Sequence, residues 1–186
     1  SKNFPGIPIY EDVTKLDCSK IGHVDVLCGG WPCQAHSTAA RGRNVQKDMW
    51  QDFFRIVQRI RPAWVIAENV PRALDGWNKI QRDFDSAGYK SAAIVVDTAI
   101  PERQRKRMRA IILANTNSES QSWRTIDEKM ASLQGIPRPL WEPRPKPMGM
   151  ANGIPRRMDR LRSLGNSVCP DTIEAIGRAI ISVGAQ

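Results

Sequence analysis

A thiol on a stiff turn is the first group in this sequence with the character of a catalyst. Cys33 lies in the stretch GGWPCQAHS, residues 29–37, which directly follows the apolar run VDVLC. Gly29 and Gly30 allow close backbone approach, and Pro32 stiffens the turn. A lone cysteine is most often a buried core residue. A thiol held at the end of a strand and followed by polar residues is nevertheless typical of a nucleophile, because a nearby cation can stabilise its thiolate.

A carboxyl group follows the next apolar run in the same way. Glu68 and Asn69 come directly after AWVIA, residues 63–67. A surface or helix-capping acid is the simpler interpretation. Because the backbone emerges from the core at this point, we expect the pKa of Glu68 to be raised and the group to act as an acid. We expect Asn69 to buttress the local turn.

The cysteines do not form a metal or disulfide framework. Four cysteines occur, at positions 18, 28, 33 and 169, and their spacing is not that of a disulfide-rich secreted domain. Cys28, Cys33 and His36 are close in sequence, but no second Cys/His pair follows them, as a zinc site would need. The sequence therefore predicts reduced thiols and no bound metal.

Basic residues are numerous and clustered. The chain carries 28 Lys and Arg against 19 Asp and Glu, a net charge of +9. Two clusters stand out, RQRKRMR at 103–109 and RRMDRLR at 156–162. A solvated basic loop is the simplest interpretation of either cluster, but together they favour a polyanionic partner such as nucleic acid. Arg105, Arg107 and Arg109 alternate ahead of a strand and would share one face.

The elements that must position these groups alternate along the chain. Nearly unbroken apolar strands separated by amphipathic helices predict an α/β fold with a mostly parallel sheet. In such sheets ligands bind beyond the carboxyl ends of strands, where Cys33 and Glu68 fall. The expected strands are 7–13, 23–30, 63–70, 91–100 and 108–115, and the expected helices are 48–60, 77–88 and 170–183. We expect a buried stripe on the first helix of Met49, Phe53, Ile56, Val57 and Ile60.

Three regions follow from these patterns. Residues 1–115 form the catalytic α/β portion, residues 116–155 form an irregular insertion rich in proline, arginine and tryptophan, and residues 156–186 pack back on the first region. No apolar run is long enough to span a bilayer. We therefore expect a soluble, intracellular protein.

The order of the motifs is more specific than any one of them. PCQ, then ENV, then R-x-R before a strand, then RLRSLGNSV resembles the DNA (cytosine-5)-methyltransferase family, most closely its compact phage or bacterial members. FPGIPIYEDVTKL is similar to the family segment that contacts the cofactor adenine. The resemblance implies a Rossmann-like fold, S-adenosylmethionine as cofactor, double-stranded DNA as substrate in the cytoplasm of a bacterial or phage-infected cell, and a short target-recognition insertion.

The resemblance also implies a mechanism. The target cytosine is flipped out of the duplex, the Cys33 thiolate attacks C6, and C5 takes the methyl group. Glu68 engages N3 and the exocyclic amine, Arg109 holds O2, and Arg107 positions the loop. The implied cofactor contacts are Asp12, Val13, Pro32, Met49, Asn166 and Ser167, and the implied substrate contacts are Gln34, Ser37, Asn69 and Arg105.

Two departures from the family pattern shape the alternatives. Arg105 stands where the family usually has glutamine. The glycine-rich cofactor loop and the acidic residue for the ribose should precede FPGIPIYEDV, but the chain begins at Ser1. We therefore expect an incomplete fold. The chain is then a subunit whose partner chain supplies the front half, a truncated copy, or a fragment. A catalytically inactive DNA-binding or scaffold protein and an RNA-directed relative remain alternatives.

Overall fold

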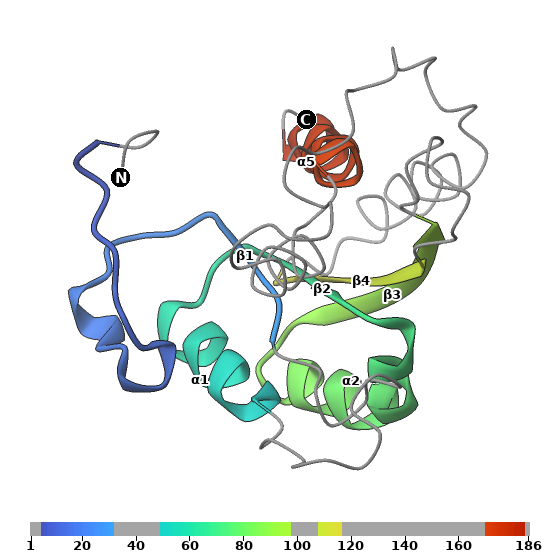
Figure 1. Cartoon of the computed structure of the whole chain (residues 1–186), viewed down its shortest axis with the longest axis horizontal. Coiled ribbons are helices and arrows are strands. Elements are labelled where there is room, and N and C mark those ends of the chain that lie inside the picture. The colour runs from blue at the N-terminus through green and yellow to red at the C-terminus, as the bar shows by residue number, and fades with distance from the viewer. Residues whose placement is uncertain (1–4, 32–48, 98–107, 117–169, 185–186) are drawn as a thin grey trace, which may run out of the picture. The chain divides into compact units, whose positions relative to one another are not determined.

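The computed structural model of the chain describes residues 5–31, 49–97, 108–116 and 170–184 (Figure 1). The chain divides into two units. The first comprises residues 1–95 and 109–118, and the second comprises residues 96–108 and 119–186. The first unit holds the candidate catalytic residues that the structure describes.

The sheet is mixed rather than mostly parallel. Its described strands are β1 (Val26–Gly29), β2 (Trp64–Asn69), β3 (Lys90–Asp97) and β4 (Met108–Asn115), in the order β1-β2-β4-β3. β1 and β2 are parallel, but β2 and β4 are antiparallel. β4 follows β3 after residues 98–107, too short a connection for the crossover helix that parallel neighbours need. The predicted α/β fold is confirmed. Parallel pairing is observed between β1 and β2, whereas β2 and β4 pair antiparallel.

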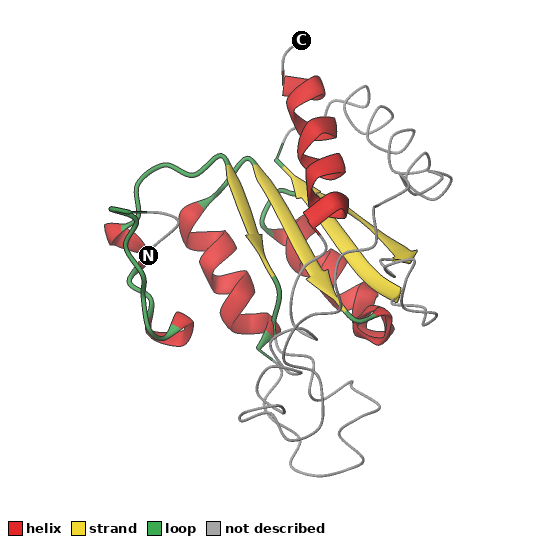
Figure 2. Ribbon diagram, turned by 45° about the horizontal axis from the view of Figure 1, so that its top comes forward, coloured by secondary structure: helices red, strands yellow, loops and turns green. Residues whose placement is uncertain are grey.

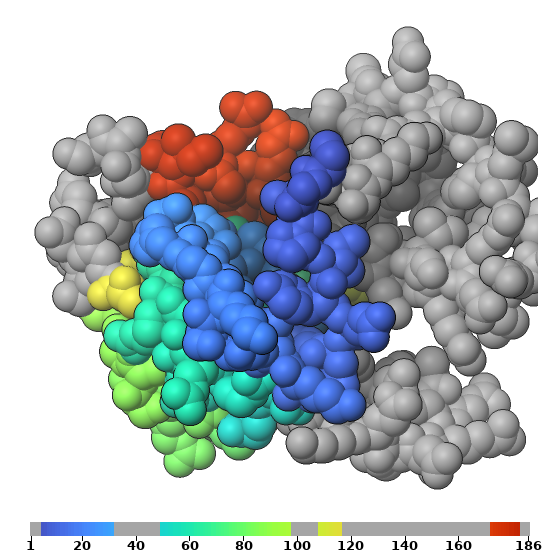
Figure 3. All heavy atoms as spheres, turned by 90° about the vertical axis from the view of Figure 1, so that its left-hand side faces the viewer, coloured from blue at the N-terminus to red at the C-terminus, as the bar shows by residue number. Residues whose placement is uncertain are grey.

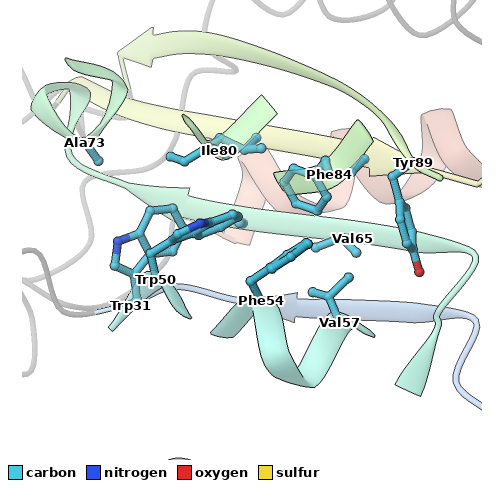
Figure 4. Close-up of a cluster of buried hydrophobic side chains, with 12 residues drawn as sticks. Trp31, Trp50, Phe54, Val57, Val65, Ala73, Ile80, Phe84 and Tyr89 are labelled. Atoms are coloured by element: carbon cyan, nitrogen blue, oxygen red, sulfur yellow. The ribbon is translucent and has the colours of Figure 1, made fainter. Parts of the chain in front are cut away.

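Helices α1 (Trp50–Ile60) and α2 (Trp77–Ser86) cover one face of this sheet (Figure 2). Their aromatic side chains form a cluster with β2 and β4 (Figure 4). Trp50 stacks on Phe54 at a centroid separation of 5.6 Å and meets Phe84 of α2 edge-on at 5.5 Å. The Trp50 indole N–H donates to Asp83 Oδ2 at 2.6 Å, which links the two helices. These contacts fix α1 on the sheet.

α1 ends at Ile60 as predicted, and α2 ends at Ser86, two residues before the predicted end at 88. α1 stops before Pro62, with Arg61 in the left-handed region at φ 56°. α2 is followed by Gly88 at φ 77°, a conformation that glycine adopts without steric cost. The predicted stripe on α1 is only partly right, because Trp50 and Phe54 are buried as well. The 3₁₀ helix η4 (Pro71–Gly76), which joins β2 to α2, was not predicted.

Two expectations for the N-terminal region are wrong. Residues 7–13 form no strand: the chain is exposed and leads into the 3₁₀ helices η1 (Val13–Lys15) and η2 (Cys18–Lys20). Pro8 has no N–H for a strand ladder, and the Asp12 carboxylate captures the Thr14 N–H instead. The predicted buried strand at 23–30 is the short β1, which lies at the end of the described sheet order and stays largely exposed.

The second unit contributes one described helix, α5 (Pro170–Gly184), which confirms the helix predicted at 170–183. Ile176 and Ile180 are buried and Ile181 is exposed, so the helix is amphipathic. Glu174 and Arg178 form an ion pair along the helix at 2.8 Å. None of the helices within the described ranges is long and apolar enough to cross a lipid bilayer.

Candidate active site

An ion pair joins the ends of β2 and β4. Arg109 Nε lies 2.8 Å from Glu68 Oε1, and the two side chains are only 16% and 17% exposed. In the antiparallel register Glu68 is opposite Ile111, so Arg109 is its diagonal neighbour on the same face of the sheet. The strand register therefore brings together two residues that are 41 positions apart in the sequence.

The chain leaving β1 passes against the end of β2. Gly30 lies so close to β2 that a Cβ added there would sit 2.5 Å from the backbone oxygen of Glu68. One residue later, the Trp31 carbonyl accepts a hydrogen bond of 3.2 Å from Asn69 Nδ2. The close approach predicted for the glycines is thus confirmed at Gly30. The chain that leads to Cys33 therefore passes beside Glu68 at Gly30 and Trp31.

Trp31 anchors this turn through its side chain as well. Its ring is 7% exposed and lies 4.9 Å from the Trp50 ring and 5.8 Å from the Phe53 ring, by centroids (Figure 4). The backbone at Trp31 is therefore held by a hydrogen bond and its side chain by aromatic packing. Cys33 follows two residues later, outside the described residues.

The Asn69 side chain bonds backbone groups on both sides of it, the local Val70 N–H and the Trp31 carbonyl. Consecutive strand residues point to opposite faces, so Asn69 points toward the helices while Glu68 points away from them. Asn69 is 4% exposed, and its Oδ1 accepts from the Val70 N–H at 2.8 Å while its Nδ2 donates to Trp31. Both ends of the amide are thus engaged in holding the backbone.

Asp12 and Val13 lie at the start of η1. Asp12 Oδ1 accepts from the Thr14 hydroxyl at 2.7 Å and from the Thr14 N–H at 2.9 Å. These hydrogen bonds lower the pKa of Asp12, so the carboxylate is ionised at neutral pH. Val13 is 46% exposed, and Met49 precedes α1 and packs against the aromatic cluster.

A protein-family model with the description C-5 cytosine-specific DNA methylase matches residues 1–146. The chain belongs to this family. The match includes the turn at Cys33, Glu68, and Arg109, so the residues singled out above lie within the methylase region.

Individual relatives agree with the family match. The Type II methyltransferase M.HgiDI of Herpetosiphon aurantiacus is 33% identical over 143 residues, covering 69% of this chain and 45% of the relative. The Type II methyltransferase M.MspI of a Moraxella species is 29% identical over 127 residues, covering 62% and 30%. The chain thus spans less than half the length of either relative.

A solved structure confirms the fold. The crystal structure of a mutant of DNMT2 from Spodoptera frugiperda superposes with a TM-score of 0.50 at 15% identity, covering 64% of this chain and 39% of that one. At this identity the likeness concerns the fold alone. It supports the Rossmann-like methyltransferase architecture that the sequence predicts.

The ion pair between Glu68 and Arg109 has a direct chemical consequence. The Arg109 guanidinium lies directly beside the Glu68 carboxyl group, so an opposite charge acts on Glu68 as well as burial, and the raised pKa expected from the sequence stays a prediction. A carboxylate accepts hydrogen bonds, and an arginine donates them from a planar fork. Together they present an acceptor and a donor side by side, which suits the polar edge of a planar heterocycle.

The remaining predicted site residues lie outside the described part of the methylase chain. They are Pro32, Cys33, Gln34, Ser37, Arg105, Arg107, Asn166 and Ser167. Sequence reasoning, in turn, missed the roles of Trp31 and Trp50. Trp31 adjoins the Pro-Cys pair, so its position was a usable signal, but Trp50 could not be linked to it without the tertiary contact.

Removing the Asn69 amide is expected to destabilise the folded chain. Asn69→Ala leaves the buried Trp31 carbonyl without its donor, which costs about 1–3 kcal/mol of unfolding free energy. The urea midpoint measures this loss. Asn78→Ala, at an exposed position on α2, serves as the control and should change stability by less than about 0.5 kcal/mol. Equal midpoints for the two variants would contradict the supporting role of Asn69.

Proposed function

We propose that this chain is the catalytic portion of a DNA cytosine-5 methyltransferase. It transfers a methyl group from S-adenosylmethionine to C5 of a cytosine flipped out of double-stranded DNA, through a covalent adduct with Cys33. The observation that carries the proposal is the Glu68–Arg109 pair, at 2.8 Å, beside the start of the turn that leads to Cys33. Membership of the methylase family and the Type II methyltransferase relatives support it.

The proposed reaction proceeds in three steps. The Cys33 thiolate forms a bond to C6 of the cytosine, and the displaced electrons make C5 nucleophilic. C5 then takes the methyl group. A base removes the proton from C5, and the C6–S bond breaks to return the thiolate. Arg107 and Arg105 position the loop and the DNA, and Gln34 and Ser37 belong to the segment that closes over the DNA.

Glu68 and Arg109 act on the ring while it is attacked. Glu68 accepts a hydrogen bond from the exocyclic amine and acts as the acid that gives N3 a proton while C6 is attacked, and Arg109 donates to O2. When the cytosine ring binds at the Glu68–Arg109 pair, hydrogen bonds from each side chain to the ring replace part of the interaction between the two side chains. Because both side chains are largely shielded from water, these charge-assisted bonds are strong.

The described residues of the proposed cofactor site fit an adenosine. The exposed Val13 side chain offers an apolar surface for the adenine, and the ionised Asp12 carboxylate offers an acceptor for its amine. When bound, S-adenosylmethionine supplies an electrophilic methyl group. Pro32, Met49, Asn166 and Ser167 complete the proposed contacts.

We also propose that a partner chain adds a parallel strand beside β1 and supplies the rest of the cofactor site. β1 is at the end of the described strand order, and Val26 on it is 37% exposed although it is apolar. Among the described residues no strand lies on the outer side of β1, and an apolar strand at a sheet edge is a template for a further strand. The proposed setting is a bacterial or phage-infected cell, within restriction–modification.

Covalent trapping tests the proposed function. DNA containing 5-fluorocytosine is incubated with S-adenosylmethionine and the chain, with and without the amino-terminal portion of a family member. Fluorine at C5 blocks the final elimination, so we expect a DNA–protein adduct that persists in denaturing gels. If no adduct forms under either condition while an intact family enzyme traps normally, the proposal is wrong. DNA binding without an adduct would instead identify an inactive DNA-binding relative.

A further inference from the structure

One arginine on α1 holds the segment that carries Asp12 and Val13. The Arg55 guanidinium donates from Nη2 to the carbonyl oxygens of Val13 and Thr14, at 3.0 and 3.2 Å. Its Nη1 donates to the Leu16 carbonyl at 3.2 Å. A single side chain therefore binds three backbone oxygens of one short segment, about 40 positions away in the sequence.

The Val13 oxygen already accepts from the Leu16 N–H, and Arg55 adds a second bond there while also binding the oxygens of Thr14 and Leu16. Carbonyl oxygens at the end of a short helical turn have few partners within the turn, so a side-chain donor can satisfy them. η1 is three residues long and makes few backbone bonds of its own, the Lys15 N–H to Asp12 at 3.1 Å and the Leu16 N–H to Val13 at 3.4 Å. The arginine guanidinium is planar, always charged and carries five N–H donors, so it can bind several of these carbonyl oxygens at once.

Burial contributes little to holding this segment. No residue of η1 or η2 is buried, and Ile7 and Ile9 before them are 62% and 74% exposed. Figure 3 shows the segment as dark blue atoms on the surface beside the cyan atoms of α1. The segment therefore depends on specific polar contacts more than a core element would.

The helix that bears Arg55 is itself fixed. Its neighbours Phe54, Ile56 and Val57 are at most 5% exposed. Arg55 therefore connects a surface segment to a helix that is packed into the core.

We propose that Arg55 is a positioning residue for the methyl donor. It arranges the backbone around Asp12 and Val13 before the adenosine arrives, so that the cofactor does not have to order this segment itself. The inference rests on the proposed function, because it takes Asp12 and Val13 to contact the adenosine.

Hydrogen exchange of the full chain tests the positioning without requiring activity. Arg55→Ala is expected to speed amide exchange in residues 12–21 by about tenfold or more, while exchange in α1 and β2 stays unchanged. Arg55→Lys keeps the charge but loses the fork, so we expect an intermediate effect. Arg59→Ala, also on α1 but exposed, is the matched control and should leave exchange as in the wild type. Unchanged exchange in Arg55→Ala would overturn the positioning role.

Binding of S-adenosylmethionine, measured by calorimetry, tests the link to the cofactor. The amino-terminal portion of a family member is included if the chain alone does not bind. We expect Arg55→Ala to weaken binding by about tenfold and Arg59→Ala to leave it unchanged. Faster exchange with undiminished binding would overturn the cofactor role of Arg55. If the wild type binds no S-adenosylmethionine under either condition, the proposed function fails, and the exchange data still decide whether Arg55 orders the segment.

Discussion

Replacing Cys33 with serine is expected to abolish the covalent adduct with 5-fluorocytosine DNA. The thiolate is the attacking species, and a serine hydroxyl remains protonated near neutral pH. The rate of methyl transfer should fall by at least about 10³-fold, as is typical when a covalent nucleophile is removed. The adduct is measured as a shifted band on a denaturing gel, and the methyl transfer with a labelled donor.

Cys28 provides the control for this experiment. Desolvation raises the pKa of the Cys28 thiol, so this group is protonated at neutral pH and is a poor nucleophile. It lies on β1, five positions before Cys33 and in the same chain segment. Cys28→Ser should therefore trap DNA like the wild type. An adduct that survives Cys33→Ser, or one that is lost in Cys28→Ser alone, would show that the nucleophile is assigned wrongly.

Adding a single methyl group at Gly30 is expected to damage both stability and catalysis. The Cβ of Gly30→Ala would lie 2.5 Å from the Glu68 backbone oxygen, so either the exit of β1 or the end of β2 must shift. Overpacking of this kind costs about 1–3 kcal/mol of unfolding free energy, which urea denaturation of the chain measures. The shift also separates the turn at Cys33 from Glu68. A displacement near 1 Å can reduce the rate on the order of 10²-fold.

Gly22→Ala is the matched control for this substitution. Nothing lies within 4 Å of a Cβ built at Gly22, and its backbone does not require glycine. We expect a change in stability of less than about 0.5 kcal/mol. If Gly30→Ala unfolds at the same urea concentration as Gly22→Ala, then the close approach of β1 and β2 does not require glycine at position 30, and the prediction is wrong.

The helices and the inner strands could be predicted because their signals are local. β4 has the predicted bounds Met108–Asn115, and β2 lies within the predicted 63–70. Both are continuous apolar runs, and burial on both faces is what such runs indicate. α5 is also correct to within one residue, because its apolar stripe and its proline at the first position are local features.

The errors concern features that depend on neighbours distant in sequence. β1 has the composition of a buried strand, but its exposure depends on which strands lie beside it. The antiparallel pairing of β4 with β2 depends on where the chain returns to the sheet, which no periodicity records. At residues 7–13 the apolar pattern was misleading because local hydrogen bonding by Asp12 prevailed over it.

The candidate site divides in the same way. The residue types and the order of the motifs, taken alone, were enough to single out Cys33, Glu68 and Arg109 and to indicate the family, because reactivity is a property of side-chain chemistry. Only the tertiary structure decided that Glu68 pairs with Arg109, that Asn69 holds the Trp31 carbonyl, and that Arg55 binds the segment of Asp12. These contacts arise from strand register and helix packing, which depend on the interactions of the folded chain as a whole.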